Sequence, residues 1–243
     1  MGDLAAETAF SEAGPKSVAL APAWHTAVVL LLFAVLAAAA FFRRNAAGHI
    51  HHRVLGYAIS IAAEWLIFGL IAIGPLWHGP SIKALAGRFS PTLRSVALDL
   101  GIAVAYLVLA NYLLAALGSV LVHLIKPGST EALKNALPHS ILEDAVFLLV
   151  ALTAGICEEV TFRGYLQRQF TGWTSNAAAG IFLQGIAFGA AHSYQGTTGI
   201  IGIAFFGCML GWLASWRKSL RPGIMAHFLY DAIGGLVLAK FIK

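Results

Sequence analysis

Residues 96–125 read VALDLGIAVAYLVLANYLLAALGSVLVHLI, an apolar run interrupted by a single carboxylate at Asp99. A helix rises about 1.5 Å per residue, so about 20 mainly apolar residues cross the hydrocarbon core of a bilayer. This run is long enough to cross the bilayer with a tilt or to project from it. It predicts a membrane-spanning helix that ends at Pro127 and Gly128.

Further apolar segments lie on both sides of this run. They cover about residues 24–42, 54–77, 141–170, 176–192, 198–216 and 222–240. Pro222 suits the first turn of the last segment, where the missing N–H of proline costs nothing. We expect Thr174 or Ser175 to cap the helix that begins near residue 176. The sequence predicts an all-α transmembrane bundle of seven spanning helices, or eight if the run 96–125 is broken.

The composition agrees with a protein surrounded by lipid. Hydrophobic residues make up 59% of the chain, charged residues make up 11%, and the mean hydropathy is +0.79. A soluble domain has about a quarter charged residues. The formal charge of +5 comes from scattered lysines and arginines, which form no continuous basic face for nucleic acid. Cys157 and Cys208 lie in apolar runs and indicate neither a disulfide nor a thiolate metal site.

We divide the chain into three regions. Residues 1–22 form a polar tail in which acids precede the first apolar run, unlike a cleavable signal peptide. Residues 23–140 contain the N-terminal transmembrane helices, and residues 141–243 contain the candidate catalytic core.

Glycine pairs predict how two of the core helices pack. Gly185 and Gly189, and likewise Gly207 and Gly211, are four residues apart. Such pairs of small residues allow helix backbones to approach closely in membranes. We therefore expect segments 176–192 and 198–216 to be tightly packed neighbours.

Three short polar stretches lie in consecutive apolar regions of the core. They read EEVTFRG at 158–164, FGAAH at 188–192 and HFLYD at 227–231. An ionisable group inside a spanning helix costs about 2.5–3.5 kcal/mol on insertion scales, so it usually has a functional or structural reason.

The spacing of these residues suggests acid–base chemistry. Glu159 and Arg163 are four apart on a helix and suit an ion pair. Glu158 lies about 100° around the helix, so it points elsewhere and stays available as a general base for water. We expect His192 to orient that water, and His227 with Asp231 to face the developing oxyanion.

Other interpretations remain open. A Glu-Glu pair often lies at a solvated helix end, a single histidine can join two helices by a hydrogen bond, and His227 with Asp231 can be a structural pair. A non-catalytic membrane scaffold or partner-binding protein with a polar core is therefore the alternative. A proton-coupled transporter would favour such residues in both halves of the chain and an internal repeat, which the sequence lacks. The occurrence of all three stretches in order favours an enzyme.

The pattern of these stretches resembles the CPBP family of CAAX-protease and bacteriocin-processing intramembrane proteases, which includes the type II CAAX prenyl endopeptidases. Its first motif matches Glu158, Glu159 and Arg163, its second Phe188 and His192, and its third His227 with Asp231. The resemblance covers about residues 141–243 and includes Phe162, which with Phe188 is expected to support the site.

This resemblance implies an intramembrane endopeptidase in which Glu158 and His192 activate water, while His227 and residue 231 hold the substrate carbonyl. The expected partners are the lipid bilayer and a membrane-associated or lipidated protein or peptide. The expected location is a bacterial cytoplasmic membrane. Oligomeric state and orientation are not predicted.

Two features concern the chemistry at the site. The expected mechanism requires no cofactor; Zn²⁺ is the alternative, because two histidines and two carboxylates can bind it. Its candidate ligands are Glu158, His192, His227 and Asp231. CAAX-type members carry Asn where this chain has Asp231, and an ionised carboxylate cannot donate a hydrogen bond. Asp231 would then orient His227, and CAAX cleavage in particular is placed in doubt.

The remaining polar residues have weaker signals. Glu64 and Asp99 fall inside apolar segments, where a bundle-facing role and a functional role are equally expected. His49, His51 and His52 form a loop cluster near Arg53, for which a solvated loop is the ordinary explanation and a metal site the alternative.

One geometric expectation follows from the helix order. His192 ends one helix and His227 lies near the start of another, so straight helices would separate them. We therefore expect the helices to be tilted, unequal in depth or broken near Gly196, Gly199 and Gly202, and we predict a wet cavity there, in which irregular backbone is tolerated.

Overall fold

The computed structural model describes residues 19–45, 53–74, 81–125, 134 and 136–241. Within these residues the chain is helical, without strands apart from an isolated bridge between Gly87 and Ser219. The predicted all-α class is confirmed. The polar tail to residue 18 and the cluster of His49, His51 and His52 lie outside the described residues.

The described helices follow the predicted apolar segments closely. They are α2 (Ala23–Asn45), α3 (Arg53–Ile73), α4 (Ile82–Ala86), α5 (Leu93–Leu124), α7 (Ile141–Glu158), η2 (Glu159–Leu166), α8 (Gln167–Thr174), α9 (Ala177–Ala191), η3 (Ser193–Gln195), α10 (Gly196–Arg217) and α11 (Arg221–Phe241). Six helical spans among the described residues are long and apolar enough to cross a membrane. The seventh predicted segment forms α9, which is apolar but has only 15 residues. Helix α5 is unbroken, and the short α4 was not predicted.

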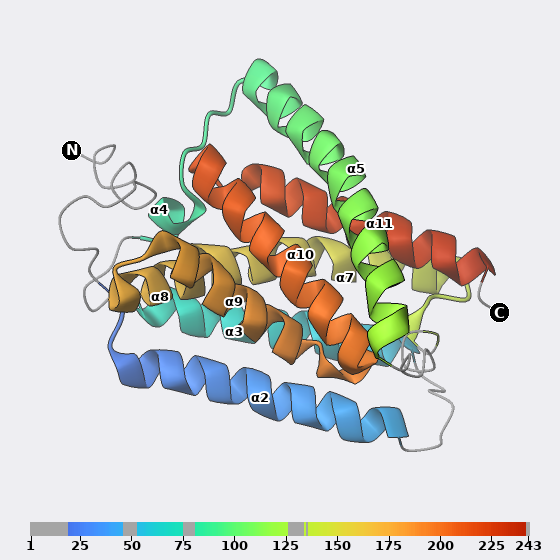
Figure 1. Ribbon diagram of the computed structural model, residues 1–243. Coiled ribbons are helices and arrows are strands. Elements are labelled where there is room, and N and C mark those ends of the chain that lie inside the picture. The colour runs from blue at the N-terminus through green and yellow to red at the C-terminus, as the bar shows by residue number, and fades with distance from the viewer. Residues whose placement is uncertain (1–18, 46–52, 75–80, 126–133, 135, 242–243) are drawn as a thin grey trace.

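The helices form a bundle around one long central rod. Helices α7, η2 and α8 continue one another from Ile141 to Thr174. Helices α3 and α11 pack on α7, α9 packs on α8, and α2 lies along α9 (Figure 1). Helix α5 crosses α10 and α11 obliquely (Figure 1). The motif residues near the middle of the rod are therefore enclosed by other helices.

Local chemistry explains where the rod begins. The Ser140 hydroxyl accepts a hydrogen bond from the Glu143 N–H, and the Glu143 carboxylate accepts one from the His139 N–H. Glu143 and Asp144 occupy the first turn, where the helix dipole favours acids.

The turn into α9 corrects one prediction. Ser175 follows α8 in the left-handed region at φ 53°. Asn176, not Thr174 or Ser175, then caps α9, because its side chain accepts the Ala179 N–H at 3.1 Å. Because Ser175 forms the left-handed turn after α8, the next residue, Asn176, becomes the N-cap of α9.

Helices α9 and α10 form the predicted close pair. A Cβ on Gly189 would collide with the backbone oxygen of Ile200, and a Cβ on Gly207 would lie 3.2 Å from the Gly185 Cα. The absence of side chains at these positions lets the backbones approach, as the spacing predicted.

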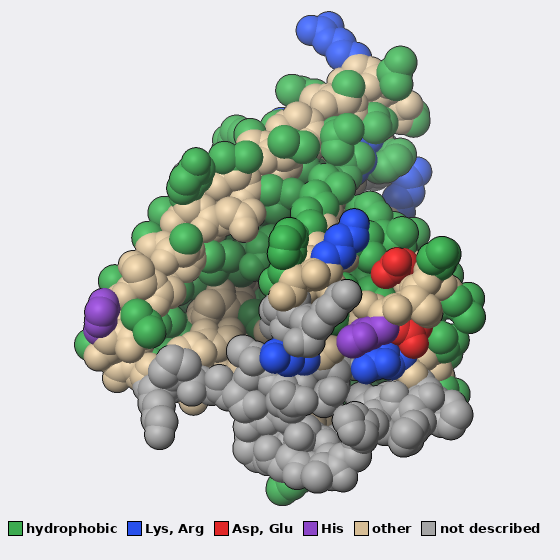
Figure 2. All heavy atoms as spheres, turned by 90° about the vertical axis from the view of Figure 1, so that its right-hand side faces the viewer, with side chains coloured by type: hydrophobic (Ala, Val, Ile, Leu, Met, Phe, Trp, Pro, Cys, Tyr) green, Lys and Arg blue, Asp and Glu red, His purple; other side chains and the backbone are tan. Residues whose placement is uncertain are grey.

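The outer surface suits a lipid environment. Leu98, Val108, Phe182 and Ile233 on three helices are each more than half exposed. Hydrophobic side chains dominate the face in Figure 2, and charged side chains are scattered among them. Apolar surface of this extent is unusual for a soluble monomer and agrees with the spans above.

Candidate active site

The first motif lies where the rod changes from an α-helix to a π-helix. Glu158 ends α7, and Glu159 begins η2. A π-helix has i→i+5 bonds and is frequent at functional sites. Both carboxylates flank the imidazole of His227, whose nitrogens lie 3.6 Å from Glu158 and 3.0 Å from Glu159. Their other partners differ, because Glu159 pairs with Arg163 whereas Glu158 faces His192.

Glu159 forms the predicted ion pair with Arg163. Its Oε1 lies 2.9 Å from Arg163 Nη1, and both side chains are fully buried. Arg163 Nη2 also donates to the Gly207 carbonyl oxygen at 3.3 Å, and the guanidinium lies 4.3 Å from the centre of the Phe188 ring. The charge of Glu159 is thus compensated within the core.

His227 lies between the acidic pair and Asp231. Its Nδ1–H donates to Glu159 Oε1 at 3.0 Å, because a carboxylate can only accept. Its Nε2 faces Glu158 Oε2 at 3.6 Å and Asp231 Oδ2 at 3.5 Å. Glu159 therefore fixes the ring and directs Nε2 towards the other two acids.

His192 approaches Glu158 from the end of α9. Its Nδ1 lies 2.9 Å from the Phe188 carbonyl oxygen, which accepts a hydrogen bond and so requires the proton on Nδ1. In the neutral ring Nε2 is then an acceptor, and it lies 3.9 Å from Glu158 Oε1. Glu158 is flanked by the Nε2 atoms of two imidazoles.

The lengths of the helices on either side of the α8–α9 turn bring His192 to the level of Glu158. Glu158 and Thr174 are separated by as many residues as Asn176 and His192. The α8–α9 turn therefore folds His192 back to the level of Glu158.

The turn between α10 and α11 lies deeper than the end of α8. A Cβ on Gly164 would be 3.3 Å from Leu220 Cδ1. From this level α11 runs beside α7, and Ile224 and Phe228 pack against Gly155. His227 consequently reaches Glu158 and Glu159.

The predicted break is confirmed at one of its three positions. After His192, η3 makes a short turn and Gly196 adopts a φ of +79°, which favours glycine. Gly199 and Gly202 lie inside α10.

Exposure increases across the site. The side chains of Glu159 and Arg163 are buried and that of His227 is 4% exposed, whereas Glu158, His192 and Asp231 are 11%, 18% and 33% exposed. The site therefore has a dry, charge-paired floor and a more accessible opening beside Asp231.

The two phenylalanines of the motifs pack behind the imidazoles. The rings of Phe162 and Phe188 are 4.9 Å apart, and the Phe188 ring lies 4.8 Å from His192 and 5.8 Å from His227. Both phenylalanines are nearly fully buried, so in this structure they support the polar residues and do not face an opening.

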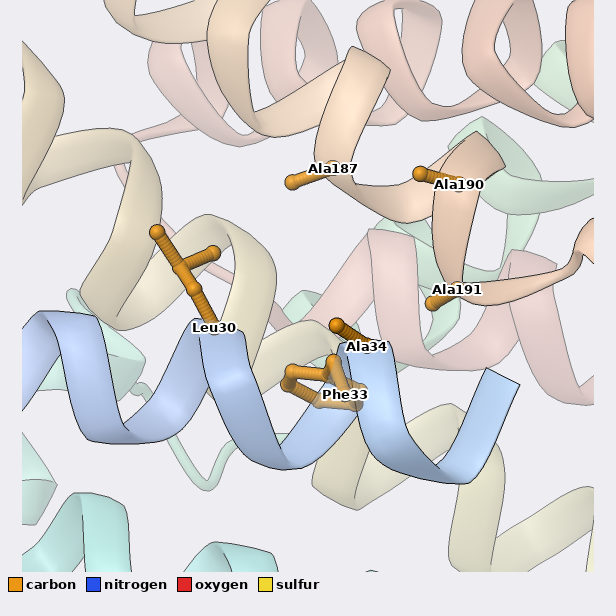
Figure 3. A pocket seen from close by; sticks show the side chains of 6 residues that line it. All are labelled: Leu30, Phe33, Ala34, Ala187, Ala190 and Ala191. Atoms are coloured by element: carbon orange, nitrogen blue, oxygen red, sulfur yellow. The ribbon is translucent and has the colours of Figure 1, made fainter. Parts of the chain in front are cut away.

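An apolar pocket of about 110 Å³ lies close to the motifs, between α2 and α9. Its lining consists of Leu30, Phe33, Ala34, Ala187, Ala190 and Ala191 (Figure 3). It includes none of the motif residues, although Ala191 precedes His192. The wet cavity remains a prediction.

Two further residues approach the site. Glu64 lies on α3, which packs along α7, and is close enough to Glu158 to interact with it electrostatically. The Tyr194 ring of η3 has its centroid 6.0 Å from that of His192. An acid in an apolar run identified Glu64 as a candidate, but the sequence could not assign it to this site. Tyr194 had no comparable signal.

The Zn²⁺ alternative finds no support in the arrangement of side chains. In the described part of the chain, no group of three or more histidine, cysteine or acidic side chains is arranged to hold a metal ion. Zinc sites need three or four ligands at about 2.0–2.3 Å from the ion. We therefore derive no step through a metal.

The geometry defines a polytopic helical membrane protein with a buried glutamate–histidine site. Residues 142–233 match the family model described as type II CAAX prenyl endopeptidase Rce1-like, and this segment contains all three motifs. This match covers the C-terminal part of the chain, and the similarity to an Rce1-like model is consistent with a CPBP-type, CAAX-type intramembrane protease at a coarse level. No curated protein and no solved structure matches the chain.

Proposed function

We propose that this protein is an integral membrane endopeptidase that hydrolyses a peptide bond in a membrane-associated or lipidated substrate. The observation that carries this proposal is the position of Glu158 between the Nε2 atoms of His192 and His227. Both distances are too long for direct hydrogen bonds, so each nitrogen and the carboxylate can bind a third group. A water molecule is the smallest such group.

In the proposed reaction, Glu158 removes a proton from this water while the water oxygen attacks the substrate carbonyl carbon. The acceptor Nε2 of His192 holds the same water. General-base catalysis of this kind contributes about 10²–10⁴-fold. Collapse of the tetrahedral intermediate breaks the C–N bond, and the proton on Glu158 passes to the leaving amine. The products are a carboxylate and an amine.

His227 is proposed to stabilise the negative oxygen of the intermediate. Glu159 holds its Nδ1–H, so a protonated Nε2 can donate towards the substrate. Asp231 lies beside this atom and is proposed to orient it by accepting its hydrogen bond until the substrate carbonyl takes over. In this scheme Arg163 positions Glu159 and does not contact the substrate.

The accessible side of the site suggests the substrate class. Asp231 is the most exposed of the motif side chains, and the helices around the site expose apolar surface. A peptide held at the bilayer by a lipid or apolar anchor would reach this opening by diffusion in the membrane. We propose the cytoplasmic membrane of a bacterium as its location and no obligatory metal.

The test uses full-length protein in vesicles with farnesylated and unmodified CAAX peptides and a transmembrane peptide library. Mass spectrometry in ¹⁸O-water should find one ¹⁸O in each new carboxyl group. Glu158→Gln should lower kcat by about 10²–10⁴-fold and remain folded and inserted. Glu143→Gln, which changes an acid at the start of α7, is the matched control and should retain activity. Unchanged turnover of a verified substrate by Glu158→Gln would reject the assigned base.

A further inference from the structure

The turn between α10 and α11 lies against the connection between α4 and α5, at one end of the bundle (Figure 1). Gly87 and Ser219 form an isolated antiparallel bridge there. Beside this bridge the Arg88 N–H donates to the Lys218 carbonyl oxygen at 2.9 Å. Opposite residues of an antiparallel pair have Cβ atoms about 4.5–5.5 Å apart. The bridge therefore brings together Arg88 and Lys218, which we call the cationic pair.

The backbone fixes the position of the cationic pair. On the other side of the bridge the Leu220 N–H donates to the Ala86 carbonyl oxygen at 2.9 Å. Lys218 follows α10 in the left-handed region at φ 51°, and a Cβ on Gly87 would collide with its carbonyl oxygen. The two cationic residues are thus neighbours because the backbones meet, although like charges directly opposite each other are destabilising.

The chain segments at this end supply little negative charge. Residues 65–98 and 160–230 contain no aspartate or glutamate. Asp99 lies next to the first of these segments, but it is 3% exposed and already forms ion pairs with Arg217 and Arg221. A single carboxylate shared by two arginines leaves no charge to offset the cationic pair, so an anion from outside these segments would stabilise this end.

Exposed aromatic side chains indicate the depth of the cationic pair in the membrane. The rings of Trp212 and Trp216 stack with centroids 5.8 Å apart, and they are 58% and 57% exposed. The guanidinium of Arg217 lies 5.7 Å from the centre of the Trp216 ring. Tryptophan is enriched at the membrane–water interface. Lys218 directly follows these residues, so the cationic pair is expected at the level of the lipid phosphates.

We propose that Arg88 and Lys218 bind the phosphate group of an anionic phospholipid, whose glycerol and acyl chains lie along the exposed face of Trp216. An arginine guanidinium can donate two parallel hydrogen bonds to phosphate oxygens, and a lysine adds a compact charge. A lipid suits the site better than a free phosphate does, because Phe89 and Leu93 beside the pair expose 61% and 85% of their surface. This inference does not depend on the proposed hydrolysis.

The test adds phosphatidylglycerol or phosphatidylcholine to the full-length protein in detergent and counts bound lipid by native mass spectrometry. Wild type should retain phosphatidylglycerol and unfold at a higher temperature with it than with phosphatidylcholine, since a ligand of the folded state stabilises that state. The double variant Arg88→Gln/Lys218→Gln should bind phosphatidylglycerol about 25-fold more weakly, at about fivefold for each cation near an anionic surface.

The matched control is the double variant Lys83→Gln/Arg94→Gln. It removes two exposed cations from the same end of the bundle, so the change in net charge is identical. Its affinity for phosphatidylglycerol should change by less than about threefold, because exposed charges away from a site are screened. The charge-conserving variant Arg88→Lys/Lys218→Arg should keep most of the wild-type affinity.

Three results would overturn the proposal. Equal losses in the two double variants would show a general attraction to anionic lipid without a site. Equal stabilisation by inorganic phosphate and by phosphatidylglycerol would make the occupant a free anion. Unchanged binding of phosphatidylglycerol by Arg88→Gln/Lys218→Gln would assign the cationic pair a role inside the protein only. If that double variant does not fold, Lys218→Gln alone decides, with an expected loss of about fivefold.

Discussion

Two clusters of charged side chains join helices in this protein, and their spacing differs. Around Asp99 of α5, Arg217 Nη2 lies at 2.7 Å and Arg221 Nε at 2.6 Å. Around Glu158, the imidazole nitrogens lie at 3.6 and 3.9 Å. The first cluster uses its hydrogen-bonding capacity internally and ties α5 to the α10–α11 turn. The second leaves Glu158 able to bind a third group.

The two clusters also differ in their balance of acidic and basic side chains. Asp99 is matched by two arginines that remain charged in proteins. Glu158 and Asp231 lie beside His192 and His227, while Arg163 is paired with Glu159. A cluster with excess acid and titratable partners can exchange protons, whereas an arginine-saturated cluster cannot. We therefore expect Asp99 to stabilise the fold, and under the proposed function Glu158 acts on the substrate.

The largest expected effects come from replacing the central acid of each cluster by its amide. Glu158→Gln should lower kcat by about 10²–10⁴-fold, with an unfolding midpoint in detergent at or above that of wild type, since catalytic residues are often strained. Asp99→Asn should lower the free energy of unfolding by about 3 kcal/mol, because two arginines lose their partner. Its kcat per folded molecule should change little. Parallel denaturation and turnover measurements check both; a destabilised Glu158→Gln with a stable Asp99→Asn would reverse the assignment.

A smaller effect is expected where the backbone approaches Glu159. A Cβ on Gly223 would lie 3.0 Å from Glu159 Oε2. Gly223→Ala should displace this carboxylate and with it His227, and lower kcat by about tenfold through misalignment. Gly234→Ala on the same helix is the control, because its Cβ meets nothing within 4 Å. Equal kcat values for the two variants would contradict the role of Glu159 in holding His227.

Asp231 should be still less sensitive. If it orients His227 only by accepting a hydrogen bond, the amide oxygen of Asp231→Asn can accept as well. We expect kcat within about threefold of wild type for Asp231→Asn and about a tenfold loss for Asp231→Leu. Measuring kcat on farnesylated peptides checks this prediction. A large rise in kcat for Asp231→Asn would instead show that the wild-type site lacks an amide donor.

The smallest effect should come from metal removal. Incubation with a strong zinc chelator should leave kcat within about twofold of that of the untreated enzyme. The reason is that the proposed reaction uses no zinc ion. Loss of activity on chelation, with recovery on adding Zn²⁺, would establish the alternative ligand set of Glu158, His192, His227 and Asp231.

Sequence patterns predicted most of the helices because bilayer thickness imposes a length on each apolar run. Helix α5 begins and ends within three residues of the predicted run 96–125. The i,i+4 spacing also predicted the pair of Glu159 with Arg163, since both lie on one rigid turn. The π-helix after Glu158 was not predicted, because apolar runs carry no signal for one extra residue per turn.

Contacts between helices were harder to predict from the sequence. Helices that are apolar on all sides have no polar face to indicate which side is buried, so Glu64 and Asp99 had equal expectations. In the structure Glu64 lies near Glu158, and Asp99 pairs with two arginines. Only their neighbours on other helices separate these outcomes.

The sequence alone determined that the chain is a helical membrane protein and which residues carry its acid–base groups, because hydrophobic length and motif spacing are local properties. The tertiary structure decided that these groups meet. It did so through a left-handed turn after α8, a break after His192 and a deep α10–α11 turn, each of which sets the depth of one helix against another. Depth depends on packing between distant segments, and no local pattern of residues contains it.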